Sequence, residues 1–176
     1  FLSAQKTQLA IGGQRQALDN IERQLPEFVA QNTWQELCSE WLLRSSARQE
    51  LPFTVEQVGS AWTRTADVDV AGINRETRHL VLGTCLWQDE PADVGALQEM
   101  VARTAAIVPE KGRWSVAYLG FSASGWTPAA RRFAEGLHES GASGANWKPV
   151  YSRLLDLEEV DDDLVRLSTA ALAPES

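Results

Sequence analysis

The sequence predicts an α/β fold in which a mixed β-sheet is flanked by helices, with a core order of helix, three strands, helix and strand. Two observations carry this prediction. Residues 67–87 have the pattern of a β-hairpin, and residues 114–121 form a nearly continuous apolar run, as expected of a strand that is covered on both faces. At 176 residues the chain suits one domain with a sizeable core.

Two helical segments are expected before the first strand. Residues 1–32 are interpreted as a helical lead-in from an upstream module, and the domain itself is placed at residues 33–157. Its first helix is expected to begin at Thr33 as N-cap, with Glu36 as the reciprocal partner of a capping box. Apolar residues at helical spacing then form a core-facing stripe: Trp34, Leu37, Cys38, Trp41 and Leu42.

Three consecutive strands are predicted at residues 52–62, 67–73 and 79–87. Side chains two apart on a strand share a face, so Asp67 and Asp69 are expected to project together. Two carboxylates side by side on a strand are typical of a cation site. One row of the partner strand is formed by Leu82, Thr84 and Leu86.

The second half of the chain completes the core order. A helix is predicted over residues 92–108 and is followed by the apolar strand 114–121. Thr127 as N-cap with Pro128 at the first helical position indicates another helix. A further strand is expected at residues 151–157.

The net charge of −8 is unevenly distributed. One short stretch holds six carboxylates: Asp156, Glu158, Glu159, Asp161, Asp162 and Asp163. The rest of the chain therefore carries a net charge of only −2. Residues 158–176 are interpreted as an acidic C-terminal tail, a short helix with a frayed end. This charge is a poor match for a phosphate backbone, so we expect nucleic-acid binding to be weak and local.

Composition is ordinary for a soluble globular protein, at 44% hydrophobic and 23% charged residues. No apolar run approaches the length of a membrane span, so the expected location is the cytoplasm without membrane contact. Cys38 and Cys85 are expected to be buried free thiols rather than a disulfide. The chain opens on Phe1 without an initiator Met, which suggests a fragment of a longer protein.

The hairpin resembles a known family. Its strands read D-V-D-V-A-G from Asp67 and G-T-C-L-W from Gly83, and the preceding helix carries W-Q-E-L-C from Trp34. These segments resemble the PD-(D/E)XK nuclease fold, which is restriction-endonuclease-like, in the version at the C-terminus of an archaeal and bacterial DEXX-box ATPase family. There the matching segments look like E-I-D-I-V-A, G-E-C-K-W and F-E-E-I-C.

The resemblance implies a degenerate active site. Asp69 aligns with the family's strand aspartate and is the best candidate metal ligand, with Asp67 as a weak or vestigial neighbour and the Cys85 main-chain carbonyl as a second ligand. The remaining functional positions are neutral here. Where the family has a metal-binding Glu, a second metal-binding Glu and a catalytic Lys, this chain has Gln35, Thr84 and Leu86.

The leading functional interpretation is therefore a non-catalytic nuclease-fold module that serves interaction or regulation at the end of a P-loop ATPase. The expected partners are the upstream ATPase and winged-helix modules and a further protein. No cofactor is expected in this part of the protein, because no Walker motif occurs and ATP would bind elsewhere. Mg²⁺ is expected only if the site is active.

Two alternatives stay open. One is an active metal-dependent DNA nuclease whose ligands have moved, with replacements drawn from Glu56, Arg64, Arg75 and Arg78. The other is a nucleic-acid-binding domain without cleavage that uses Arg131, Arg132 and nearby arginines.

Overall fold

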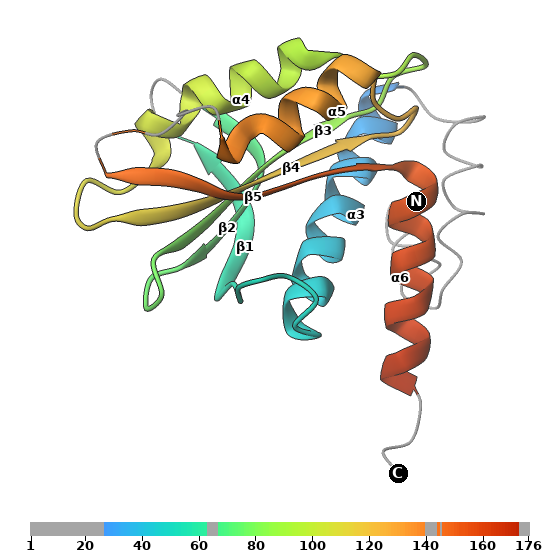
Figure 1. The fold of residues 1–176 in the computed structure, drawn as a ribbon. Coiled ribbons are helices and arrows are strands. Elements are labelled where there is room, and N and C mark those ends of the chain that lie inside the picture. Colours follow the sequence, from blue (N-terminus) through green and yellow to red (C-terminus); the bar gives the residue numbers. More distant parts are fainter. Residues whose placement is uncertain (1–26, 63–66, 140–143, 145, 173–176) are drawn as a thin grey trace.

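A five-stranded mixed sheet lies between two pairs of helices (Figure 1). The computed structural model describes residues 27–62, 67–139, 144 and 146–172. The elements in chain order are α3 (Glu27–Ala47), β1 (Gln57–Trp62), β2 (Asp67–Asn74), β3 (His79–Leu86), α4 (Val94–Ile107), β4 (Trp114–Ser122), α5 (Pro128–Glu135), the 3-10 turn η1 (Gly136–His138), β5 (Trp147–Asp156) and α6 (Leu157–Leu172).

The strands follow one another in the order β1-β2-β3-β4-β5. The first two pairings are antiparallel, and the pairings of β3 with β4 and of β4 with β5 are parallel. The predicted fold class is confirmed: the sheet is mixed, helices flank it, and the core order is helix, three strands, helix and strand. The hairpin is in the expected place, with Ala71 opposite Leu82.

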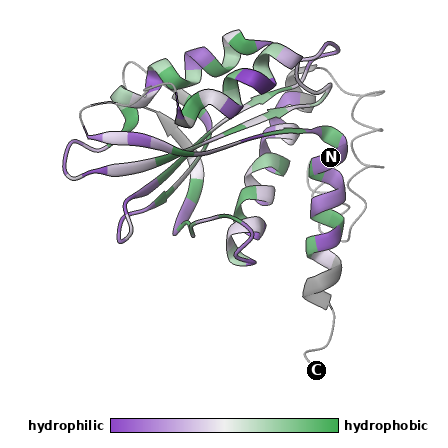
Figure 2. Cartoon of the chain, in the orientation of Figure 1, coloured by the Kyte–Doolittle hydropathy of each residue, from purple (hydrophilic) through white to green (hydrophobic). Residues whose placement is uncertain are grey.

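Side-chain alternation along the strands builds a separate core on each face of the sheet. On β3, Val81 and Cys85 face the layer of α3 and α6, whereas Leu80 and Leu82 face the layer of α4 and α5. In Figure 2 the turns at the end of the sheet where β3 and β4 begin are hydrophilic, and the apolar residues concentrate on the strands and the helices beside them.

The first helix is longer than the sequence predicted. α3 already begins at Glu27, so Thr33 lies inside the helix, 4% exposed, and the expected N-cap and capping box at Thr33 and Glu36 are wrong. Neither Gly nor Pro lies between Glu27 and Thr33, so nothing in the local sequence stops the helix there. The boundary set at residue 33 thus falls within one helix, and most of the expected lead-in lies outside the described residues.

The acidic segment is also more ordered than expected. Residues 157–172 form α6, which packs on α3 through Val160 and Leu164, each 1% exposed. Of its acidic residues, Asp161 is itself buried, and Asp163 pairs with Arg166 and accepts a hydrogen bond from the indole N–H of Trp41 at 2.8 Å. The described part of the segment interpreted as a tail therefore packs against the core.

Other local predictions hold with adjusted ends. Thr127 caps α5, since its side chain accepts a hydrogen bond from the Ala130 N–H. Cys38 and Cys85 are buried free thiols, as predicted. β1 begins later than expected and β5 begins earlier. Within the described residues, no helix has both the length and the apolar character needed to cross a membrane.

Candidate functional site

The carboxylate of Asp69 on β2 is bound to the end of β3. Its Oδ2 accepts a hydrogen bond from the Cys85 N–H at 2.8 Å and a longer one from the Thr84 hydroxyl at 3.4 Å. The hairpin register explains this contact: Val70 lies opposite Gly83, so Asp69 comes level with Thr84. Two of the residues predicted to share a site are thus side by side.

Helix α3 supplies the third member. The Gln35 side chain donates from Nε2 to the Asp69 main-chain carbonyl at 2.5 Å. Gln35 lies one residue after Trp34, which is fully buried in the core under α3, so packing of the helix fixes the direction of its neighbour. The structure therefore brings Gln35, Asp69 and Thr84 together from three separate elements.

A further polar residue completes the cluster and was missed from the sequence. Gln31 donates from Nε2 to the Cys85 carbonyl at 2.8 Å, and its Oε1 accepts from the Trp87 N–H at 2.8 Å. Gln31 precedes Gln35 by four residues and so shares its helix face. This spacing would have identified Gln31, but the sequence prediction began the helix at Thr33, six residues too late.

Both main-chain groups of Cys85 are consequently held by side chains. Its N–H is bound by Asp69 and its carbonyl by Gln31. We call the set Gln31, Gln35, Asp69, Thr84 and Cys85 the Asp69 cluster. It connects α3, β2 and β3 by hydrogen bonds.

The thiol of Cys85, whose main chain belongs to the cluster, lies in the same core as that of Cys38. Cys38 is 0% and Cys85 2% exposed, and their thiols hydrogen-bond to each other. Burial raises the pKa of the Cys38 thiol well above its usual value, and the hydrogen bond with Cys85 raises it further. Burial also raises the pKa of Cys85. Both groups are therefore neutral packing residues at physiological pH.

The last two predicted positions do not join the cluster through a described contact. Leu86 is half-buried and packs against the core beneath α4 and α5. Asp67 pairs with Trp62 through the main chain at the start of β2. Its side chain lies outside the described residues.

The sequence profile of one protein family, described as archaeal and bacterial proteins of unknown function (DUF234), matches residues 1–102. The chain belongs to this family. The match covers the Asp69 cluster completely, from Gln31 on α3 to Cys85 on β3. Neither the curated proteins nor the solved structures contain a match.

Within the described residues, the Asp69 cluster of this DUF234 member offers one carboxylate to a cation. Mg²⁺ is commonly bound by one or two carboxylates together with substrate oxygens. Of the described side chains in the cluster only Asp69 is a carboxylate, and its Oδ2 already accepts two hydrogen bonds. The described residues contain no group of three or more His, Cys, Asp or Glu side chains that could hold a metal ion.

The proposed replacement residues lie at the wrong end of the sheet. Arg75 and Arg78 are in the turn between β2 and β3, and Glu56 accepts a hydrogen bond from the Arg75 N–H. Thr84 lies six residues further along the chain than Arg78, a distance of about 20 Å along a strand. None of these three side chains can act at Asp69. Arg64 lies outside the described residues.

Proposed function

We propose that this chain is a catalytically inactive nuclease-type domain that serves interaction or regulation within a larger ATP-binding protein. The observation that carries the proposal is the Asp69 cluster. The aspartate stands where the resembled nucleases hold their metal, and here its carboxylate closes a hydrogen-bond network with neutral neighbours.

The chemistry of the cluster supports loss of catalysis. Metal-dependent phosphodiester cleavage needs a cation, a water that it activates, and a positive group that stabilises charge on the phosphate. Gln35 and Thr84 add no charge to hold a cation, and Leu86 can supply neither a proton nor a positive charge. Removal of one such electrostatic group typically lowers a rate by about 100-fold to 1000-fold, so three changes together leave little activity.

The same cluster supports a structural role for Asp69. A buried main-chain N–H needs an acceptor, and the Asp69 carboxylate supplies one for Cys85. The carboxylate thus holds β2 to the end of β3, and Gln31 and Gln35 fix α3 against the hairpin. The upstream ATPase and winged-helix modules, and any further protein partner, remain proposals that rest on the family resemblance.

The test is a titration with magnesium, measured by calorimetry. It compares the wild type with the triple variant Gln35→Glu, Thr84→Glu and Leu86→Lys. We expect no measurable binding by the wild type. The variant should gain affinity, because two added carboxylates lie beside Asp69. A matched control makes the same charge changes at exposed positions of β1 and α4: Gln57→Glu, Gln98→Glu and Ala105→Lys.

Cleavage of duplex DNA with Mg²⁺ or Mn²⁺ is measured on the same proteins. Wild-type cleavage that disappears in Asp69→Ala would show that the domain is an enzyme and would overturn the proposal. Equal affinity of the triple variant and the control would show that Gln35, Thr84 and Leu86 do not form one site, and the nuclease resemblance would then lose its support.

A further inference from the structure

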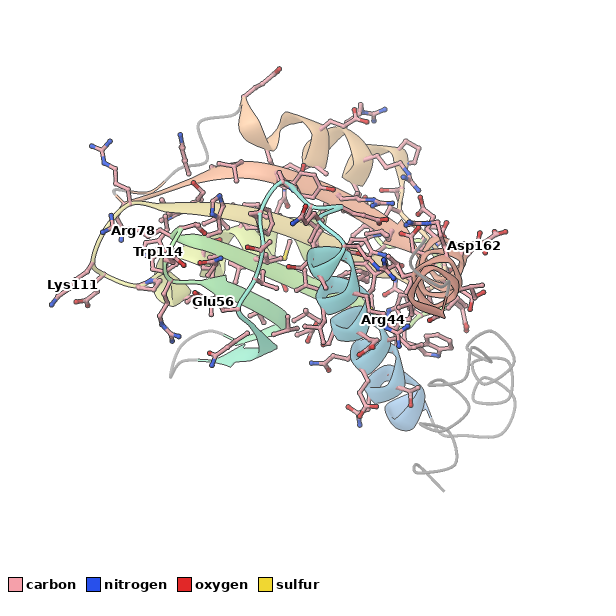
Figure 3. All side chains as sticks on the ribbon, turned by 90° about the horizontal axis from the view of Figure 1, so that it is seen from below. Arg44, Glu56, Arg78, Lys111, Trp114 and Asp162 are labelled. Atoms are coloured by element: carbon pink, nitrogen blue, oxygen red, sulfur yellow. The ribbon has the colours of Figure 1, made fainter. Side chains whose placement is uncertain are left out.

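Cations gather at the end of the sheet that lies opposite the Asp69 cluster. Strands β3, β4 and β5 run parallel and begin together: His79 lies level with Ser115, and Ser115 with Lys148. The turns that lead into β3 and β4, and the first residues of β5, carry five exposed cations: Arg75, Arg78, Lys111, Arg113 and Lys148. We call these five the basic surface. Figure 3 shows Arg78 and Lys111 at this end and Arg44 and Asp162 at the other.

Within the described residues, none of these five side chains forms an ion pair. The ion pairs of the structure involve other residues, chiefly on α3, α4 and α6. The nearest carboxylates in the same turns are Glu76 and Glu110, and Glu56 is bound to the Arg75 N–H. Five cations and three carboxylates leave this region at +2, so the remainder of the chain carries −10. An acidic protein has therefore kept one positively charged end.

Arg78 occupies a backbone conformation that is unusual for arginine. Its φ is 56°, in the left-handed region that glycine adopts without strain. A Cβ at position 112 would lie only 3.0 Å from Cζ of Arg78, so the guanidinium lies against Gly112, whose φ is 88°. A strained residue that is kept where glycine would fit better points to a role for its side chain.

The basic surface lacks the apolar anchors of a protein-docking site. Energetic hot spots of protein interfaces are buried aromatic and arginine side chains that enter pockets. The large hydrophobic side chains that are exposed within the described residues, Leu43 and Val165, lie on α3 and α6. Trp114 is 6% exposed, and its indole N–H donates to the Lys111 carbonyl. Charge without apolar anchors fits a phosphate backbone better than a protein surface.

We propose that the basic surface binds the phosphate backbone of duplex DNA. Three neighbouring strands span about 10 Å, close to the width of the major groove, so cations from three turns can reach phosphates on both edges of one groove. This names a partner class for the interaction role proposed above. Failure here would leave the assignment of the Asp69 cluster unchanged, because the two tests alter different residues.

The acidic helix does not cancel this attraction. Asp156 lies eight residues further along β5 than Lys148, and α6 begins directly after it, so the acidic segment starts about 26 Å away. The Debye length at physiological salt is about 8 Å, and repulsion over three such lengths is largely screened. The net charge of −8 of the whole chain therefore does not describe the attraction between the basic surface and a phosphate backbone.

The experiment measures fluorescence anisotropy of a labelled 20-base-pair duplex as salt rises from about 50 to about 200 mM. If all five cations contact phosphates, the logarithm of the affinity should fall against the logarithm of salt with a slope of up to about −4.5, or about 500-fold over this range. The double variant Arg113→Ala, Lys148→Ala should make this negative slope shallower by about 2 and weaken binding about 60-fold at about 0.1 M salt.

Two controls keep the result specific. The variant Arg131→Ala, Arg132→Ala removes the same charge from exposed positions of α5 and should leave the slope unchanged. The variant Arg78→Gly should lower the slope by about 1 without lowering the melting temperature, because glycine relieves the left-handed conformation. Weakened binding in Arg78→Gly therefore cannot be assigned to unfolding.

Three outcomes would overturn the proposal. Wild-type protein with no salt-dependent binding to the duplex would show that the basic surface has no phosphate partner. Equal loss in the α5 control would show that binding is non-local. Tighter binding to poly-glutamate or to vesicles of anionic lipid than to the duplex would assign the surface to an acidic protein or to a membrane instead.

Discussion

Replacement of Asp69 by alanine separates a structural role from a retained metal ligand. The variant removes the acceptor of the Cys85 N–H, a main-chain group of a residue that is only 2% exposed. A buried donor left without an acceptor costs about 1–3 kcal/mol, and the lost bond is to a charged acceptor, which places the cost in the upper half of that range. The bond from Thr84 is 3.4 Å long and adds little. We expect the free energy of unfolding to fall by about 2–3 kcal/mol.

Urea denaturation of the wild type, Asp69→Ala and Asp69→Asn measures this quantity. Asparagine keeps an oxygen that can accept from the Cys85 N–H while it removes the charge, so its cost should be about 1 kcal/mol. If the carboxylate served only to bind an ion, Asp69→Ala would raise the free energy of unfolding, because functional residues are commonly retained at the expense of stability. Equal or greater stability of Asp69→Ala than of the wild type would refute the structural role.

Two further predictions concern the cores. Burial raises the pKa of Tyr118 to about 12, whereas the pKa of the unfolded chain is near 10. The neutral phenol therefore stabilises the fold fully below pH 10, and this stabilisation, about 3 kcal/mol, is lost as the pH rises towards 12. In Tyr118→Phe the free energy of unfolding should fall less steeply between these two pH values. A steep fall that persists in Tyr118→Phe would place its cause elsewhere. Leu164→Ala on α6 should cost about 2–5 kcal/mol because the side chain is 1% exposed, whereas the exposed Asp162→Ala should change stability little. If both variants change the free energy of unfolding equally little, α6 does not pack against the core and is the frayed tail that its acidic composition predicted.

The hairpin and the buried strand were predictable because their signals are local. Polar and apolar residues alternate through β2, and β4 is apolar along almost its whole length, so period and composition fix both elements. Strand parity and the family resemblance placed Asp69 next to Thr84, and the structure has them in contact. The contact of Gln35 with Asp69 follows from the same alignment.

The two segments that were misjudged, α6 and the start of α3, have different causes. In α6 the acidic residues dominate the composition, but Val160, Leu164 and Leu167 recur at i, i+4 and i+7 and form a buried stripe. The prediction for this segment relied on its acidic composition and did not consider the helical spacing of its apolar residues. Gln31 was missed because a plausible cap at Thr33 cut the helix short, and capping signals alone cannot exclude that a helix continues through them.

The pairing of α3 with α6 determines when the chain can complete its fold. Trp41 is hydrogen-bonded to Asp163, which is 122 residues away, and the Arg166–Glu50 ion pair spans 116 residues. On the ribosome the N-terminal residues emerge first, so the part of α3 that packs on α6 lacks its partner until nearly the whole domain has been synthesised. Contacts of such large sequence separation also close late and slowly. The fold of this domain is therefore complete only once α6 has been synthesised and has docked on α3.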